Sequence, residues 1–306
     1  MLSISKIQES YGFKHSKWKV NGELLDTEKG IKRLILWSDE KNARWHLQWR
    51  DSLWIKSGSL TNRMLQTVKG QKMLLSESGW ITLHDEVSSL FPYKGREKEF
   101  GKFIGLYFSQ DLKEFETEIY DPILDEESLD YAKKQISTTI RKKEIRFLEA
   151  MRKESLFRLS KATRVKGKNN HLKEPVVAPI RTLDQGKIVF EKFYWHNITG
   201  KPERGYHSLK TVLSEWLQRY GQNSLFLLLN EIDKYFPLKQ EHGQQLLANC
   251  LAPWEYIDFI DKIKDLDNLT EVQVWKEKLS YQWEASRALV QALDEWLDAT
   301  RKKVNV

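Results

Sequence analysis

The sequence contains one cysteine in 306 residues and no window approaching 18 uninterrupted apolar residues. A single cysteine excludes an intramolecular disulfide and a cysteine-ligated zinc site, a usage typical of a reducing compartment. Cys250 lies in the apolar run 246–252, so we expect a buried and unreactive thiol. Because long apolar runs are missing, we expect no membrane span and no signal segment at the start, and synthesis in the cytoplasm.

Several short motifs that mark enzyme families are also missing. The chain has no Walker phosphate loop, no HExxH, no GxSxG and no GxGxxG, which removes the usual sequence signatures of those catalytic and nucleotide-binding classes. Its seven histidines never pair at metal-ligand spacing. The run His84-Asp85-Glu86 is the one dense polar cluster after a strand-like stretch, and we interpret it as a turn leaving a sheet rather than a catalytic group.

Aromatic and charged residues are abundant. The chain has 12 Trp, 11 Tyr and 13 Phe, with 40% hydrophobic and 30% charged residues, which predicts a packed globular protein with a solvated surface. Its length predicts one large two-lobed unit or two packed domains. The net charge of +7 would favour anionic partners, although solubility is the plainer interpretation.

The residue pattern changes along the chain. Residues 11–90 contain short β-branched and aromatic segments between turn signals, which predict strands, one of them over 31–37. Within this region 42–57 has helical spacing and predicts a helix with Gly58 as its C-cap. A hinge is predicted at 92–95, after which the pattern is mainly helical.

The later predicted elements are a long helix over 128–165, strands within 175–199 and helices over 208–220, 223–235, 239–249, 252–264 and 270–300. The sequence therefore predicts an α+β fold with a small mixed β lobe over residues 1–92 and a larger, mainly helical lobe over 93–306. This order of elements is typical of kinase-like folds, although a fold alone does not establish a function.

Much of the positive charge lies between residues 141 and 168. A basic helix of this kind is compatible with nucleic-acid binding, but it carries no recognised motif. We prefer the interpretation that it presents a solvated face.

The spacing of several residues resembles a known family. In the first third of the chain these are Trp18, Lys29-Gly30, Lys32-Arg33-Leu34, Trp49-Arg50-Asp51-Ser52-Leu53, Ser57-Gly58, Asn62-Arg63, Thr67 and Gly70-Gln71. In the last third they are Lys201 to Leu209, Tyr235-Phe236-Pro237-Leu238, Leu246-Leu247-Ala248 and Leu251 to Tyr256. In this order they resemble the spore-coat-associated, phosphotransferase-like proteins of endospore-forming bacteria, which are similar to aminoglycoside and choline kinases.

The resemblance implies a protein-kinase-like fold of the aminoglycoside phosphotransferase type, but with a degenerate site. An active member would have a His-x-Asp…Asn catalytic loop and, later, an Ile-Asp-Phe-Asp strand end that holds magnesium. The corresponding stretch 171–181 contains no Asp, and Asp184 lies too close to the next strand to replace it. In the metal-holding stretch 188–195, Lys192 and Tyr194 stand near the places of the carboxylates.

We therefore expect no catalytic residue, no metal ligand and no bound cofactor. Lys32 alone is a candidate for residual phosphate pairing, with an ordinary charged residue on the exposed face of a strand as the alternative. The leading hypothesis is a non-catalytic pseudo-phosphotransferase that serves as a structural or assembly component of the spore coat, with other coat proteins as partners. The alternatives are an active small-molecule kinase that uses Glu174 or Glu191, and a basic nucleic-acid-binding protein.

Overall fold

A computed structural model describes residues 3–110, 117–121, 124–134, 136, 138–167, 172–266 and 268–304. The chain forms two compact units, one of residues 1–120 with 175–204 and one of residues 121–174 with 205–306. The boundary that the sequence predicts between residues 92 and 93 lies inside the first unit, so the division into lobes at that point stays a prediction.

The first unit is built on a five-stranded antiparallel sheet in the order β1-β2-β3-β6-β5. Its strands are β1 (Ser16–Val20), β2 (Leu24–Thr27), β3 (Gly30–Trp37), β5 (Leu74–Ser76) and β6 (Gly79–Asp85). The strand predicted over 31–37 is confirmed as β3. It pairs with β6, which comes later in the chain, so the predicted helix crosses between two neighbouring strands.

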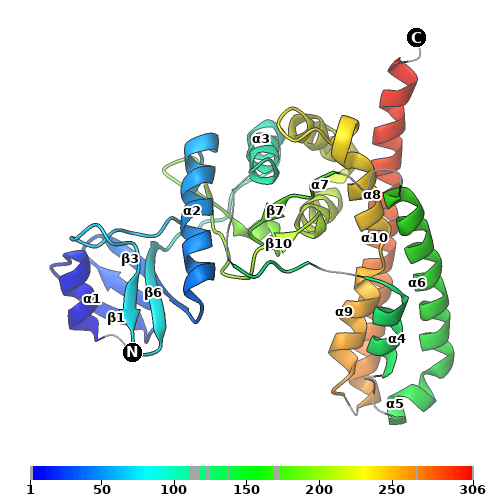
Figure 1. Cartoon of the computed structure of the whole chain (residues 1–306), viewed down its shortest axis with the longest axis horizontal. Helices are drawn as coiled ribbons and strands as arrows, with labels where there is room; N and C mark the ends of the chain where they lie inside the picture. Colours follow the sequence, from blue (N-terminus) through cyan, green and yellow to red (C-terminus); the bar gives the residue numbers. More distant parts are fainter. Residues whose placement is uncertain are drawn as a thin grey trace. The chain divides into compact units, whose positions relative to one another are not determined.

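Helices α1 (Ile4–Tyr11) and α2 (Glu40–Ser57) lie on the two sides of this sheet (Figure 1). Side chains alternate along a strand, so Leu34 packs with the α1 cluster while its neighbour Ile35 packs with the α2 cluster. The predicted helix is confirmed as α2. Gly58 ends it in the left-handed conformation at φ 66°, where its N–H donates to the carbonyl of Trp54, as expected for a C-cap glycine.

The rest of the first unit is held by an aromatic core. It contains α3 (Glu97–Phe108), β4 (Leu60–Thr61), β7 (Val176–Val177), a 3-10 turn at Leu183–Gln185, β8 (Gly186–Val189), β9 (Lys192–Trp195) and β10 (Glu203–Arg204). Strand β9 lies between β4 and β8. Its residues Phe193 and Trp195 pack against Phe100 and Phe103 of α3, with ring centroids 4.8 to 6.2 Å apart. The strands predicted within 175–199 are confirmed.

The second unit is helical. It contains α4 (Glu126–Lys134), α5 (Thr138–Lys143), α6 (Ile145–Lys166), α7 (His207–Asp233), a π-helical turn (Leu238–His242), α8 (Gly243–Leu251), α9 (Trp254–Ile263) and α10 (Leu269–Val304). Helix α7 is interrupted at Gly221, which has φ 78° and ψ 174°, so the predicted break between 208–220 and 223–235 is confirmed.

The single helix predicted over 128–165 is wrong. The chain forms α4, α5 and α6 there, and α4 lies beside α6 and α9 (Figure 1). Leu129, Ile136, Ile140 and Leu148 are all buried in one cluster with residues of α9 and α10. One straight helix spreads apolar residues along its length, and these four reach a common core because the chain turns between them.

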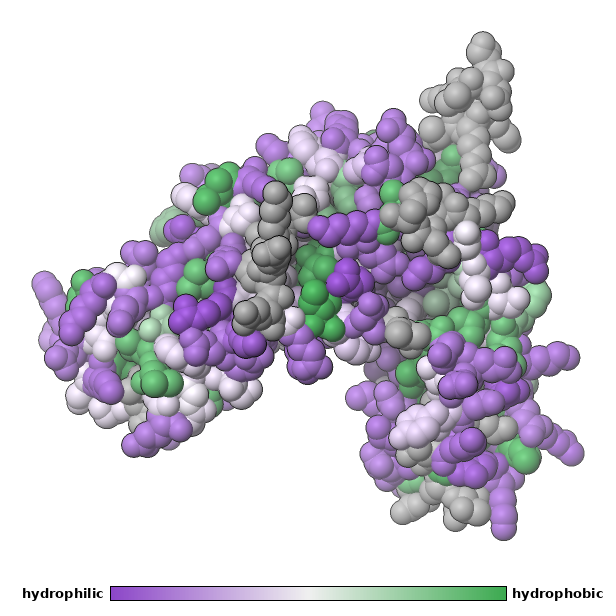
Figure 2. All heavy atoms as spheres, in the orientation of Figure 1, coloured by the Kyte–Doolittle hydropathy of each residue, from purple (hydrophilic) through white to green (hydrophobic). Residues whose placement is uncertain are grey.

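Hydrophilic side chains predominate on the face drawn in Figure 2, where hydrophobic ones form small separate groups. In the described part of the chain, no helix combines the length and the apolar character needed to cross a membrane. Cys250 is buried as predicted, and burial raises the pKa of its thiol to about 12.

Candidate functional site

Residues 178–185 form the loop between β7 and β8, and Gln185 fixes its shape. The Oε1 atom of this buried side chain accepts the N–H groups of Arg181 and Thr182 at 2.6 and 3.2 Å. Its Nε2 donates to the carbonyl of His196 at 3.1 Å. The loop is therefore tied to the residue that follows β9.

The residues that begin this loop are apolar or basic. After β7 come Ala178, Pro179, Ile180 and Arg181, and Asp184, the loop's one acidic residue, is exposed in the 3-10 turn. The Asp184 carboxylate therefore lies at the end of the loop next to β8, and not on the part that follows β7. The prediction that 171–181 lacks an Asp concerns this loop and the residues before it, of which His171 lies outside the described residues.

Arg50 of α2 occupies the exit of β9. Its side chain is fully buried, and its guanidinium donates to the carbonyl of Asn62 at 3.2 Å. It also donates to the carbonyls of Asn197 and Ile198 at 3.4 and 3.3 Å. The first residues after β9 are thus held by a cation from α2.

Asn62 completes this arrangement. Its side-chain nitrogen donates to the carbonyl of Asn197 at 3.2 Å, and its side-chain oxygen accepts the Asn197 N–H at 2.8 Å. The Asn197 amide side chain is itself fully buried and, within the described residues, makes no hydrogen bond. Both the N–H and the carbonyl of Asn197 are therefore hydrogen-bonded, while its own amide side chain has no hydrogen-bond partner within the described residues.

His84 lies in the interior of the first unit, and the prediction that it belongs to a turn leaving the sheet is wrong. It is part of β6 and fully buried, with Nδ1 2.8 Å from the Asn62 carbonyl and Nε2 2.8 Å from the Thr82 hydroxyl. Burial, reinforced by the Arg50 guanidinium, holds the pKa of His84 well below its ordinary value. The ring is therefore neutral, donates from Nδ1 and accepts at Nε2.

Arg50 carries a buried charge without a buried counter-ion. Burial lowers its pKa to about 10, so it remains protonated at neutral pH. Within the described residues no carboxylate forms an ion pair with it. It donates to carbonyl oxygens, lies 3.4 Å from Nδ1 of His84, and its guanidinium carbon is 5.9 Å from the ring of Trp37. Burial lowers the pKa of the neighbouring His196 to about 4, so the guanidinium is the one fixed charge among these groups.

The ammonium of Lys32 is already paired. It lies 2.5 Å from a carboxylate oxygen of Asp85 and 2.6 Å from the carbonyl of Lys29, and the residue is 6% exposed. By strand alternation it shares the α1 side of the sheet with Leu34, whereas Arg33 shares the α2 side with Ile35. The expectation of an exposed strand position is wrong, because the Lys32 side chain is buried and its ammonium is paired with Asp85. Phosphate pairing by Lys32 stays a prediction.

Lys192 does not lie at the end of β9, and its predicted place beside the metal-binding strand end is wrong. It opens the strand, is exposed, and lies three residues before Trp195, where β9 ends. The reason is the length of the hairpin: Val189 pairs directly with Lys192, so only two residues form the turn. Glu191 belongs to that turn, and Glu174 forms an ion pair with Lys166 at 3.0 Å.

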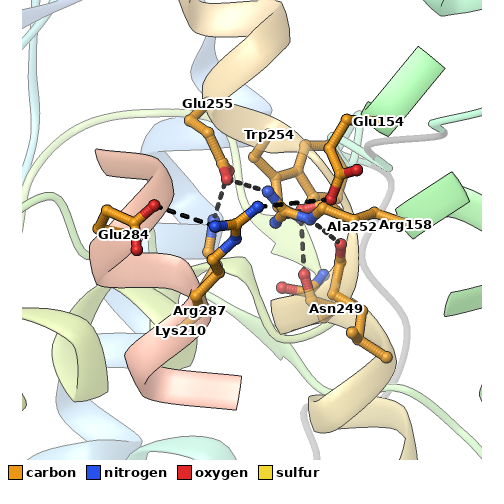
Figure 3. Close-up of polar contacts among 10 residues, drawn as sticks. Glu154, Arg158, Lys210, Asn249, Ala252, Trp254, Glu255, Glu284 and Arg287 are labelled. Atoms are coloured by element: carbon orange, nitrogen blue, oxygen red, sulfur yellow. Dashed lines mark hydrogen bonds and ion pairs between the residues drawn. The ribbon is translucent and has the colours of Figure 1, made fainter. Parts of the chain in front are cut away.

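A second polar cluster lies in the helical unit (Figure 3). Glu255 of α9 is 3% exposed and pairs with Arg158 of α6, and its other oxygen is 3.7 Å from the ammonium of Lys210. Arg158 also donates to the carbonyls of Leu251 and Ala252 at 2.9 and 3.3 Å. One of the basic residues predicted to face solvent therefore points into the unit.

Comparison with known proteins identifies the fold. No protein-family profile and no curated protein matches the sequence. Among solved structures, an aminoglycoside phosphotransferase from Alicyclobacillus acidocaldarius superposes with a TM-score of 0.70 at 10% identity, covering 98% of this chain and 97% of that one. The chain has an aminoglycoside phosphotransferase-like fold. The predicted α+β, kinase-like fold class is thereby confirmed.

Two further structures extend the comparison. An AMP-bound spectinomycin phosphotransferase gives a TM-score of 0.60 at 11% identity, covering 95% of this chain and 96% of that one. A choline kinase from Streptococcus pneumoniae gives 0.52 at 13%, covering 95% and 96%. At these identities the likeness concerns the phosphotransferase fold, so the chemistry has to be argued from the residues of this chain.

The β9 exit does not fit a magnesium ion, the metal that such a fold implies. Magnesium prefers carboxylate and other oxygen ligands in octahedral geometry. Here the carbonyls of Asn62, Asn197 and Ile198 already accept hydrogen bonds from a cation. In the described ranges no three side chains of His, Cys, Asp or Glu lie together where they could hold a metal ion.

Proposed function

We propose that the protein is a non-catalytic member of the phosphotransferase fold, a pseudo-phosphotransferase that serves as a structural or assembly component of the bacterial spore coat. The observation that carries the first half of this proposal is the buried Arg50 at the exit of β9. The second half rests on the sequence resemblance to spore-coat-associated proteins, and it makes other coat proteins the partners.

Arg50 opposes metal binding in two ways. A divalent cation near the β9 exit would be repelled by a fixed positive charge in a region screened from water, where charges interact strongly. The backbone oxygens of Asn197 and Ile198 that could contribute to a metal site are hydrogen-bonded to the same guanidinium. Phosphoryl transfer relies on metal ions to neutralise the phosphates, so this arrangement favours a protein without turnover.

The β7–β8 loop supports the same conclusion. Catalysis by this fold needs a base that orients the attacking hydroxyl, and a general base has to lie within hydrogen-bond reach of that proton. The loop leaves β7 through Pro179, Ile180 and Arg181, and Gln185 holds it in place through its own side chain. Neither a proline, an isoleucine nor an arginine can accept a proton at neutral pH.

The first test is nucleotide binding. We expect a thermal-shift titration with ATP to give the same melting temperature with and without magnesium, because the metal has no site at the β9 exit. A spectinomycin phosphotransferase, which shares the fold, is the positive control. A saturable ATP-dependent rise in melting temperature that appears only with magnesium would refute the non-catalytic half and favour a small-molecule kinase.

The second test is location. A fluorescently tagged copy of the chain, expressed in a sporulating endospore former, is expected to form a shell around the developing spore. The control is the fluorescent protein alone, expressed without the chain from the same promoter, which should spread evenly through the cell that makes it. A tagged chain that stays evenly distributed through sporulation would refute the spore-coat half and leave the non-catalytic half untouched.

A further inference from the structure

The first unit contains a cavity of about 690 Å³. Its lining shares no residue with the β7–β8 loop or with the segment that follows β9. This volume falls in the range of small-molecule sites, roughly 300 to 1,000 Å³. Its wall comes from the start of β3, the second half of α2, residues 60–61, 63–66 and 72, the end of β6 with residues 86–87, the β8–β9 turn and Tyr194 of β9. None of the loop residues 178–185 and none of residues 196–198 lines it.

The carboxylates in the wall are all neutralised by neighbouring cations. The three pairs are Lys32–Asp85, Lys72–Asp51 and Arg33–Glu86. The Arg33–Glu86 contact uses two parallel hydrogen bonds of 2.6 and 2.8 Å, the geometry of a strong charge-assisted pair. These groups therefore contribute almost no net charge to the cavity.

Two further cations in the wall have no such partner. In the described part of the chain neither Lys29 nor Arg63 forms an ion pair, and each lies over an aromatic ring instead. The Lys29 ammonium is 5.6 Å from the Phe13 centroid, and the Arg63 guanidinium is 4.3 Å from that of Trp54. The cavity consequently carries a net positive charge that is available to an anion.

Flat apolar surfaces accompany these cations. Trp54 is 37% exposed and Phe190 is 92% exposed, and both line the cavity. A guanidinium that stacks on an indole ring leaves its edge N–H groups free for hydrogen bonds to an anion. The wall thus offers an anion site next to surfaces suited to an aromatic group.

The hairpin explains the conformation of the β8–β9 turn, but not the choice of phenylalanine at position 190. Phe190 and Glu191 form the two-residue β8–β9 turn with φ values of 47° and 63°, a turn that normally uses Asn and Gly. A bulky residue at positive φ costs of order 1 kcal/mol or more, and an almost fully exposed ring recovers little of that by burial. Strain of this kind at the rim of a cavity points to contact with a ligand.

We infer that this cavity binds a small anion attached to a flat apolar group. Arg63 and Lys29 receive the anionic group, and Trp54 and Phe190 contact the flat part. The site uses none of the residues on which the proposed loss of catalysis rests, so it can be tested independently of that proposal.

The probe is the anionic dye 1-anilinonaphthalene-8-sulfonate, titrated by calorimetry into the folded chain. Its neutral analogue N-phenyl-1-naphthylamine has the same rings without the sulfonate. We expect one high-affinity dye site per chain. The Arg63→Gln variant should bind the anionic dye about tenfold more weakly, a loss of about 1.4 kcal/mol, and should bind the neutral analogue as the unchanged protein does.

Arg44→Gln is the matched control. Arg44 is also an exposed arginine of the first unit that lies over a tryptophan, 5.9 Å from the Trp80 centroid, but it pairs with Glu40 and does not line the cavity. Its affinity for both dyes should stay unchanged, whereas Phe190→Ser should weaken both. The inference is overturned if Arg63→Gln binds the anionic dye normally, or if Arg44→Gln loses as much affinity as Arg63→Gln.

Discussion

Replacing Arg50 with alanine is expected to lower the free energy of unfolding by about 3–5 kcal/mol. The change empties the volume of an arginine in the dry interior of the first unit. It also removes the hydrogen bonds to the carbonyls of Asn62, Asn197 and Ile198. Urea unfolding followed by circular dichroism measures the loss.

Arg50→Met separates volume from charge. Methionine fills much of the same space without carrying a charge, and replacing a buried ion by an apolar side chain of similar size is often close to neutral. We expect it to cost less than about 1.5 kcal/mol. Arg44→Ala, an exposed change on the same helix, should cost less than about 0.5 kcal/mol. An Arg50→Met variant as unstable as Arg50→Ala would show that the charged guanidinium and its hydrogen bonds to the carbonyls stabilise the fold, rather than the volume that it fills.

Replacing Glu255 with glutamine is expected to lower the free energy of unfolding by about 3–5 kcal/mol as well. The change leaves Arg158, which is 7% exposed, without its carboxylate, and removes the partner of Lys210 (Figure 3). A neutral amide does not compensate the charge that the carboxylate did, and the remaining carbonyl contacts of Arg158 replace only part of the lost interaction. The same urea titration, read on the helical signal, measures the effect.

The control lies at the edge of the same cluster. Glu284→Gln removes an exposed partner of Arg287, whose ion pair is solvated on both sides, and should cost less than about 0.5 kcal/mol. Adding Arg158→Met to Glu255→Gln should recover a large part of the loss, since no unpaired guanidinium then remains buried. If the double variant is less stable than Glu255→Gln alone, the arginine contributes through its backbone hydrogen bonds instead.

Sequence patterns correctly predicted the elements in which the buried residues recur at one regular spacing. The tryptophans of α2 recur at helical spacing and Gly58 follows them, and the structure has both the helix and its left-handed cap. The same helical spacing also indicates that Arg50 is buried. His46, Arg50 and Leu53 are four and three residues apart and all three are buried, so Arg50 lies on the inward face, although composition alone suggests a surface residue.

Patterns failed where burial depends on distant partners. Apolar residues between Leu129 and Leu148 fit one helical stripe, yet they converge because α9 and α10 provide a common core. Lys192 was misplaced for a related reason. The two-residue turn at Phe190 and Glu191 sets the register of β9. Such turns normally contain Asn and Gly, so the sequence did not indicate a turn at this place.

The sequence by itself determined the fold class, the place of α2, the absence of Asp from residues 171–181 and the buried single cysteine. Each follows from residue identity or from a period of two or 3.6 residues, which short stretches carry completely. Tertiary structure alone decided that Arg50 closes the β9 exit, that Lys32 is held by Asp85 and that Arg63 and Lys29 border a cavity. These depend on which side chains meet across strands and helices far apart in the chain, and burial then fixes their charge and partners.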